Sequence, residues 1–214
     1  MSARRPGIEK SLRAASALLV GCLLMAACSE PGLPPLDADA RILAFGDSLT
    51  HGTGADADAA YPARLARRLG RQVIESGRPG ELASEGRRRL QAVLERVQPD
   101  LVVLCHGGND ILRGRDPSAI RRDLVAMIEL AQDHGAAVLL VGVPARGLFT
   151  DTADFYYEVA ETTGVPLEDE VLEEIIVDPS LKSDRVHPNA AGYARMAEAV
   201  HAALAAAGAV APAD

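Results

Sequence analysis

Hydrophobic and polar positions along the chain divide it into short apolar runs separated by longer amphipathic segments. In two of these segments the apolar residues recur at helical spacing. One of the two contains Ile120, Leu124, Met127 and Ile128. The predicted strands are residues 42–45, 72–75, 101–105, 137–143 and 165–167. The predicted helices are residues 61–69, 81–97, 117–134, 152–163 and 189–206. Strand and helix therefore alternate along the whole chain.

This alternation predicts an α/β fold in which helices cover both faces of a parallel sheet. We expect a flavodoxin-like three-layer sandwich with about five parallel strands in the order 2-1-3-4-5. In open sheets of this kind, ligands bind beyond the carboxyl ends of the strands, where the strand order reverses. Any functional site is therefore expected at that edge, between the first and third strands.

The first 27 residues have the pattern of a secretory signal. Four basic residues precede an apolar stretch at 14–27, which is shorter than the ~20 residues of a membrane-spanning helix. The stretch ends in Ala26-Ala27-Cys28, which resembles a bacterial lipobox and predicts a lipidated Cys28. Cys22 and an ordinary signal without lipid are the alternatives. Lipidation would anchor the protein in the bacterial cell envelope at the periplasmic face, and Ser29 favours the outer membrane of a Gram-negative source.

The remaining chain is long enough for one domain. We expect a linker at 28–40, one folded domain at 41–207 and a tail at 208–214. The formal net charge of −8 argues against a nucleic-acid partner, because binding to phosphates requires an excess of Lys and Arg. Removal of the basic signal makes the chain more acidic still. Cys105 then stands alone, so no intramolecular disulfide is expected.

Four short motifs carry the candidate chemistry. Three of them follow the first three predicted strands: F-G-D-S-L-T with Ser48, a glycine at Gly80, and G-G-N-D with Asn109. The fourth, D-R-V-H, ends at His187 just before the last helix. The fold rule places the first three at one sheet edge, and the loop before the last helix can reach the same edge.

These residues offer the parts of a serine nucleophile site. A serine hydroxyl needs a base beside it, and His187 is the candidate base for Ser48. Asp184 lies three residues before His187, so its carboxylate can accept from Nδ1–H and leave Nε2 free for the serine proton. The alternative roles are a helix N-cap for Ser48 and a turn acid for Asp184.

Charge that develops on a carbonyl oxygen requires fixed hydrogen-bond donors. The backbone N–H groups of Ser48 and Gly80 and the side-chain amide of Asn109 are the candidate oxyanion donors. The alternative for Asn109 and the glycines before it is closure of the loop after the third strand. Asp47 and Asp110 are expected to bond loop N–H groups. The acidic run 168–174 and His201 are expected at the surface.

The substrate-binding residues are harder to predict. Leu112, Leu148 and Phe149 follow the third and fourth strands at the same edge, where they could line an acyl groove. Ordinary loop packing explains the same positions equally well.

The motifs together resemble the SGNH (GDSL-type) hydrolases, in the branch of multifunctional thioesterases, lysophospholipases and arylesterases. The resemblance covers about residues 41–204 and rests on F-G-D-S-L-T-H-G, E-S-G-R-P-G-E, H-G-G-N-D-I-L-R-G and S-D-R-V-H-P-N-A-A-G-Y. It implies an acyl-enzyme mechanism on esters, thioesters or lysophospholipids, without cofactor or metal and without an obligate protein partner. The implied roles are nucleophile for Ser48, oxyanion donors for Gly80 and Asn109, base for His187 and orienting acid for Asp184.

One motif departs from the family pattern. Glu75, Pro79 and Leu82 stand where relatives usually carry Asn, Ser and Thr, although Gly80 keeps its place. The departure leaves the chemistry intact and opens the question of rate and substrate. Two alternatives remain: an esterase that removes O-acetyl groups from carbohydrates or cell-wall glycans, and a non-catalytic envelope lipoprotein.

Overall fold

A computed structural model describes residues 32–147 and 151–212 of the chain. The predicted signal segment, the predicted lipidation site Cys28 and the groove candidates Leu148 and Phe149 lie outside the described residues. Within the described ranges, none of the helices combines the length and the apolar character needed to cross a membrane.

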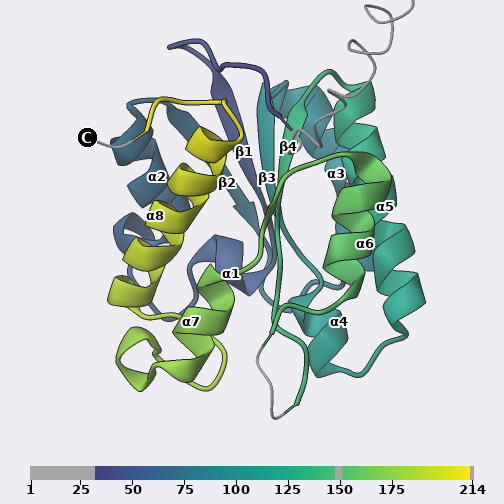
Figure 1. The fold of residues 1–214 in the computed structure, drawn as a ribbon, viewed down its shortest axis with the longest axis vertical. Helices are drawn as coiled ribbons and strands as arrows, with labels where there is room; N and C mark the ends of the chain where they lie inside the picture. The colour runs from purple at the N-terminus through teal and green to yellow at the C-terminus, as the bar shows by residue number, and fades with distance from the viewer. Residues whose placement is uncertain (1–31, 148–150, 213–214) are drawn as a thin grey trace, which may run out of the picture. The chain divides into compact units, whose positions relative to one another are not determined.

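Five parallel strands form one sheet in the order β2-β1-β3-β4-β5 (Figure 1). The strands are β1 (Arg41–Gly46), β2 (Gln72–Gly77), β3 (Leu101–Cys105), β4 (Ala137–Val141) and β5 (Leu167–Glu168). The predicted fold class and strand order are therefore confirmed. The central strands β1 and β3 are buried almost throughout, as continuous apolar runs in a parallel sheet require.

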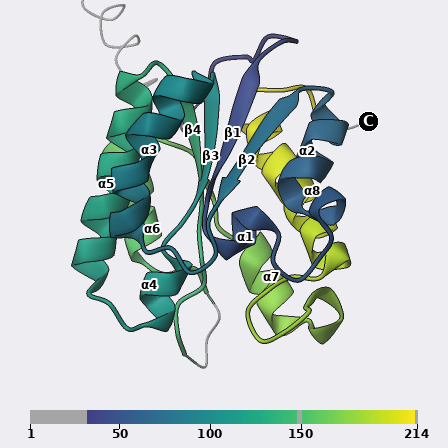
Figure 2. The same cartoon turned by 180° about the vertical axis from the view of Figure 1, so that it is seen from behind.

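Helices cover the two faces of the sheet as separate layers (Figures 1 and 2). One layer holds α2 (Tyr61–Leu69) and α8 (Ala190–Ala206), and the other holds α3 (Ala83–Val97), α5 (Pro117–Asp133) and α6 (Phe155–Thr163). The predicted apolar stripe of α5 is buried against the sheet. Short helices follow the strands: α1 (Ser48–His51), α4 (Gly108–Leu112) and α7 (Val171–Val177), with 3₁₀ turns at η1 (Ala57–Ala59) and η2 (Pro179–Leu181).

The region after β4 differs from the sequence-based expectation. The last strand is β5 rather than residues 165–167, because the Gly142 N–H donates to the Glu168 carbonyl at 2.8 Å. The acidic run was expected at the surface, which is wrong for Glu168, since only 8% of this residue is exposed. Helix α7, which the acidic composition concealed, buries Val171, Leu172 and Ile175. His201 is also buried rather than exposed, because it lies on the inner side of α8.

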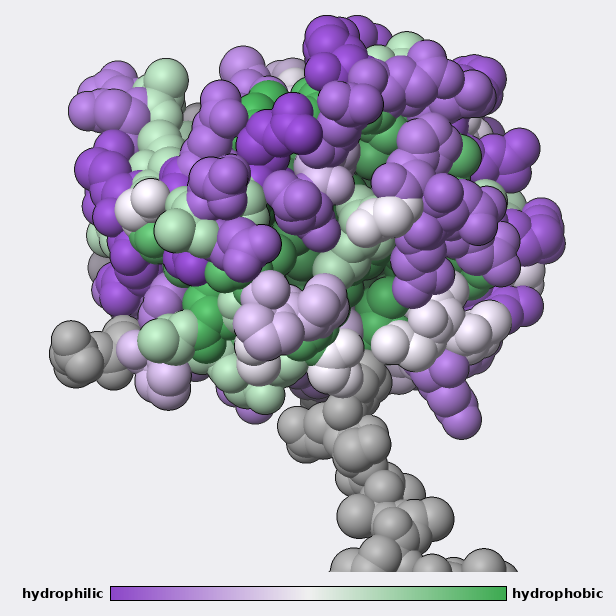
Figure 3. Space-filling view, turned by 90° about the horizontal axis from the view of Figure 1, so that it is seen from above, coloured by the Kyte–Doolittle hydropathy of each residue, from purple (hydrophilic) through white to green (hydrophobic). Residues whose placement is uncertain are grey.

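The described ends of the chain lie together at the amino-terminal edge of the sheet. The N–H groups of Leu33 and Leu36 donate to the carbonyls of Ala207 and Ala209, at 2.7 and 2.8 Å. Residues from Leu33 onwards, expected as linker, thus lie against the residues that follow α8. Figure 3 views the domain from this end and shows hydrophilic side chains interspersed with hydrophobic ones.

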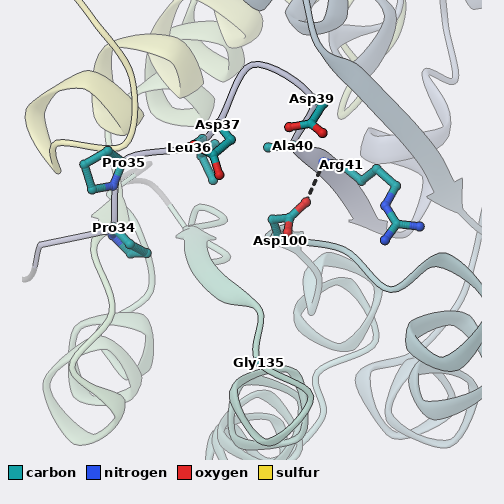
Figure 4. A pocket seen from close by; sticks show the side chains of 9 residues that line it. All are labelled: Pro34, Pro35, Leu36, Asp37, Asp39, Ala40, Arg41, Asp100 and Gly135. Carbon is teal, nitrogen blue, oxygen red and sulfur yellow. Dashed lines mark hydrogen bonds between the residues drawn. The ribbon is translucent and has the colours of Figure 1, made fainter.

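A pocket of about 440 Å³ lies at the same amino-terminal edge (Figure 4). It is lined by residues 34–37 and 39–41 together with Asp100 and Gly135, and the Asp100 carboxylate accepts from the Arg41 N–H at 2.7 Å. None of the candidate catalytic residues lines this pocket. The candidate chemistry lies at the opposite edge.

Candidate active site

Ser48 is placed by the sharp turn that follows β1. Strand β1 ends at Gly46, and Asp47 caps the four-residue helix α1, in which Ser48 is the first residue. The buried Asp47 carboxylate accepts from the Leu49 N–H at 3.1 Å, which fixes the turn. As the first helical residue, Ser48 has an N–H without an intrahelical partner, free to face a ligand.

His187 lies in the loop before α8 and reaches Ser48 across 139 residues of sequence. Its Nε2 lies 3.0 Å from the Ser48 Oγ, and its Nδ1 lies 2.7 Å from the Asp184 Oδ2. Pairing of Lys182 with Pro188 closes the loop at its base, and the Ser183 N–H donates to the His187 carbonyl at 2.9 Å. The structure thus brings the three side chains together in one hydrogen-bonded chain.

The Asp184 carboxylate is held in its ionised form. Its Oδ1 accepts from the N–H groups of Val186 and His187, at 2.9 and 2.8 Å. Burial opposes ionisation, but these bonds and the one with the His187 ring lower the pKa of Asp184 to about 2. An ionised Asp184 keeps the proton of His187 on Nδ1, so that Nε2 is the acceptor facing Ser48.

Gly80 lies in the loop between β2 and α3, beside a pocket of about 610 Å³ that Arg78, Arg88 and Arg89 also line. Its φ of +80° belongs to the left-handed region, which glycine adopts without strain. Its carbonyl accepts from the Arg113 guanidinium at 3.1 Å. The Gly80 N–H makes no hydrogen bond within the described residues, so it is available to a ligand.

Asn109 lies in α4, directly after β3. Its Nδ2 donates to the Asp47 Oδ2 at 3.1 Å and to the Glu81 carbonyl at 3.2 Å. The amide is therefore tied to the turn that carries Ser48 and to the loop that carries Gly80. Asp110 accepts from the Ala83 N–H at 2.8 Å, so it has the structural role that the sequence suggested.

Below this edge lies a charged cluster that sequence reasoning missed. Glu81, Arg89 and His106 are nearly or wholly buried, and both carboxylate oxygens of Glu81 are bonded. Glu81 precedes α3 and Arg89 lies within it. His106 follows the buried strand β3 and lies beside them, and no local pattern in the sequence indicates this contact.

The predicted groove residues are only partly described. Leu112 ends α4 with 48% of its surface exposed, and its carbonyl accepts from the Arg146 guanidinium at 3.2 Å. An exposed leucine near the site is compatible with substrate contact and with ordinary loop packing. The acyl groove stays a prediction.

Comparison with known proteins identifies the family of this chain. The family described as the GDSL-like lipase/acylhydrolase family matches residues 44–195, which contain all the candidate catalytic and oxyanion residues. The chain belongs to this family. It is an SGNH-type carboxylic ester hydrolase.

Relatives within the GDSL-like family span most of the chain. Esterase TesA of Pseudomonas aeruginosa is 31% identical over 194 residues, covering 86% of this chain and 94% of that protein. The Escherichia coli protein named thioesterase 1/protease 1/lysophospholipase L1 is 31% identical and covers 69% of this chain and 75% of its own length. The crystal structure of AlinE4, an SGNH-hydrolase family esterase, is 33% identical with a TM-score of 0.63 and covers 83% of this chain and all of that one.

Proposed function

We propose that the protein hydrolyses carboxylic esters or thioesters of acyl substrates through an acyl-enzyme on Ser48. The observation that carries this proposal is the hydrogen-bonded chain from the Ser48 Oγ through His187 to Asp184, with distances of 3.0 and 2.7 Å. A serine hydroxyl with a base at this distance and an oriented imidazole has the arrangement that nucleophilic acyl transfer requires.

In the proposed mechanism, the Ser48 Oγ attacks the acyl carbon while His187 Nε2 takes its proton. The oxyanion accepts hydrogen bonds from the N–H groups of Ser48 and Gly80 and from the Asn109 amide, which shares one of its two N–H groups between its present acceptor and the oxyanion. Collapse of the tetrahedral intermediate breaks the bond to the leaving alcohol or thiol, which receives the proton from His187. Water then repeats the sequence on the acyl-enzyme, releasing the acid and restoring Ser48.

The nucleophile is tested by covalent labelling and by turnover. A fluorophosphonate probe should label the purified protein at Ser48, and Ser48→Ala should lose both the label and at least roughly 10³-fold in hydrolysis of p-nitrophenyl acetate. Thr53→Ala, a second hydroxyl just beyond the same short helix, is the matched control and should keep both. Hydrolysis by Ser48→Ala at the wild-type rate would overturn the proposal.

The substrate class is inferred from the relatives. The names of the Escherichia coli and Pseudomonas aeruginosa proteins include esterase, thioesterase and lysophospholipase. We infer that acyl esters, acyl thioesters and lysophospholipids are the substrates to test first. These compounds and an O-acetylated glycan should be assayed separately as substrates. Release of acetate from the glycan without hydrolysis of the acyl substrates would favour the carbohydrate esterase instead.

We also propose that Leu112, Leu148 and Phe149 line the acyl groove. If so, Leu148→Asp should lower kcat/KM for long p-nitrophenyl esters more than for the acetate, because a carboxylate opposes burial of the chain. An unchanged chain-length profile would place the groove elsewhere.

Export and anchoring are proposed from the first 28 residues alone. We propose that the mature protein begins at a lipidated Cys28 in the cell envelope. Mass spectrometry of the mature N-terminus after expression with the native leader tests this. A diacylated or triacylated Cys28 is expected, and a free Cys28 or cleavage elsewhere would contradict it.

A further inference from the structure

Glu81, Arg89 and His106 form one hydrogen-bonded cluster beneath the loop between β2 and α3, which carries Gly80. Arg89 Nε and Nη2 donate to the two carboxylate oxygens of Glu81 at 2.8 and 2.6 Å, a two-pronged pair. His106 Nε2 lies 3.2 Å from the same carboxylate. The exposed fractions of the three side chains are 6%, 9% and 0% in that order. So complete a set of buried partners fixes each member in one position.

Arg89 connects this cluster to the ends of two strands. Its guanidinium donates to the Ser76 hydroxyl at 2.8 Å and to the Ser76 carbonyl at 3.2 Å, near the end of β2. It also donates to the Gly46 carbonyl at 3.4 Å, two residues before Ser48, and lies 4.1 Å from the ring centroid of Phe45. The turn that carries Ser48 is thus held from below.

His106 connects the cluster to the end of β3. Its Nδ1 accepts from the Gly107 N–H at 3.0 Å, so Nε2 carries the proton that is donated to Glu81. Its carbonyl accepts from the Tyr156 hydroxyl at 2.7 Å. The ring lies so close to helix α3 that a side chain at Gly86 would collide with it. The turn leading to Asn109 is therefore fixed by the same imidazole.

Glu81 joins the two remaining oxyanion donors through its own backbone. Its N is bonded to the carbonyl carbon of Gly80, and its carbonyl accepts from the Asn109 Nδ2 at 3.2 Å. Arg78 and Pro79 are exposed, and the loop is otherwise held by two bonds, from the Arg78 N–H to the Gly46 carbonyl at 3.0 Å and from Arg113 to the Gly80 carbonyl. The inward-facing Glu81 side chain is the buried anchor among them, directly after Gly80.

Oxyanion donors act only if they are in position before charge develops. We propose that Glu81, Arg89 and His106 are positioning residues that hold the donors of Ser48, Gly80 and Asn109 in one fixed arrangement. The proposal rests on the proposed function, because it assigns a purpose to a cluster beneath that site. The three residues touch no reacting atom and act through the loops that they join.

The first test substitutes His106, since Arg89 would still pair with Glu81 and preserve the ion pair. His106→Leu should lower kcat for p-nitrophenyl acetate by about tenfold to a hundredfold, the usual consequence of donors misplaced by ~1 Å. KM should stay within about twofold, because oxyanion contacts form in the transition state. His106→Gln should recover part of kcat, since its amide can still donate to Glu81.

Arg89→Lys provides a second variant that keeps the charge and loses the two-pronged geometry. It should also lower kcat with little change in KM. If both His106→Leu and Arg89→Lys keep wild-type kcat per labelled active site, or change KM alone, the proposal is wrong.

A double-mutant cycle with Asn109 separates positioning from general stability. In an Asn109→Ala background one of the positioned donors is already missing, so the factor lost through His106→Leu should shrink by at least about threefold. If His106→Leu lowers kcat by the same factor in both backgrounds, the two residues act independently and His106 does not position Asn109.

Leu124→Ala is the stability control, because Leu124 is fully buried in α5 on the core side and contacts none of the three loops by hydrogen bond. It should lower Tm while kcat per labelled site stays unchanged. A fall in kcat as large as that of His106→Leu would attribute the effect to stability and refute positioning. Failure of the proposed function would look different, since the wild-type protein itself would then show neither probe labelling nor turnover.

Discussion

Glu81 and Glu168 are both buried near carboxyl ends of strands, yet their electrostatics are opposite. Only 7% and 8% of the two residues are exposed. Burial raises the pKa of Glu168 to about 7. At Glu81 burial acts in the same direction, but hydrogen bonds with His106 and Arg89 and the Arg89 charge lower the pKa to about 2. With similarly small exposed fractions, Glu81 is therefore ionised, whereas at Glu168 the fold favours the neutral acid.

The difference lies in the partners. Glu168 Oε1 accepts from the N–H groups of Glu170 and Val171, at 3.3 and 3.0 Å, whereas its buried Oε2 finds no partner within the described residues. Asp169 and Glu170 add repulsion. On the β1–β3 side of the edge, the Glu81 carboxylate is therefore matched by the Arg89 cation and by hydrogen-bond donors to both of its oxygens. On the β4–β5 side, the Glu168 carboxylate has no such partners.

The largest effect is expected at a third carboxylate, Asp184. Half of its side chain is exposed, and its pKa of about 2 arises because the His187 ring and two backbone N–H groups of the loop outweigh the effect of burial. Asp184→Asn should lower kcat by ~10²–10⁴-fold, since the imidazole of His187 loses its orienting acceptor. Steady-state kinetics measure the loss. Asp178→Asn, a turn carboxylate that accepts from the Ser180 N–H, is the matched control and should keep full activity.

Asn109→Ala removes a donor on the β1–β3 side of the edge, where Ser48 and Glu81 lie. We expect kcat to fall by ~10²–10³-fold with KM little changed, the usual consequence of losing one oxyanion donor. Gln132→Ala removes an exposed amide that donates to the Thr163 carbonyl, and it should leave kcat at the wild-type value. A wild-type kcat for Asn109→Ala would remove Asn109 from the proposed oxyanion hole.

Glu81→Gln tests whether the matched charge stabilises the fold. The pKa of about 2 lies below the unfolded value of 4.5, so ionised Glu81 stabilises the fold above about pH 4.5 and this contribution is lost as the pH falls towards 2. The variant leaves Arg89 buried without its counter-charge and should lower the free energy of unfolding at pH 7 by on the order of 3 kcal/mol. Urea unfolding measures it, with exposed Glu95→Gln as control.

Glu168→Gln should change the free energy of unfolding in the opposite direction from Glu81→Gln, and by a smaller amount. The pKa of about 7 lies above the unfolded value of 4.5, so the fold favours neutral Glu168 and loses stability as the pH rises through 7. The variant cannot ionise at this position and escapes that loss. Its free energy of unfolding relative to the wild type should therefore increase by about 1–3 kcal/mol as the pH is raised from 5 to 8. The exposed neighbour Glu170→Gln is the control. A variant that is less stable than the wild type at pH 8 would contradict the comparison.

Much of the site was predictable because its residues belong to short motifs. Ser48, Gly80 and Asn109 each follow a strand, and parallel strands bring their carboxyl ends to one edge. Asp184 and His187 lie three residues apart in a loop bounded by Pro188, so their contact is local. The predictions failed where composition misled: an acidic run concealed the buried Glu168 and helix α7, and His201 gave no sign of facing inward.

The sequence by itself determined the alternation of strands and helices, the family, and which residues stand at the ends of the strands, since these follow from periodicity and local motifs. Only the tertiary structure decided which charges are compensated. Glu81 meets His106 from 25 residues away and Ser48 meets His187 from 139 residues away. The physical reason is that the free energy of a buried charge depends on its neighbours in space, and packing alone sets those neighbours.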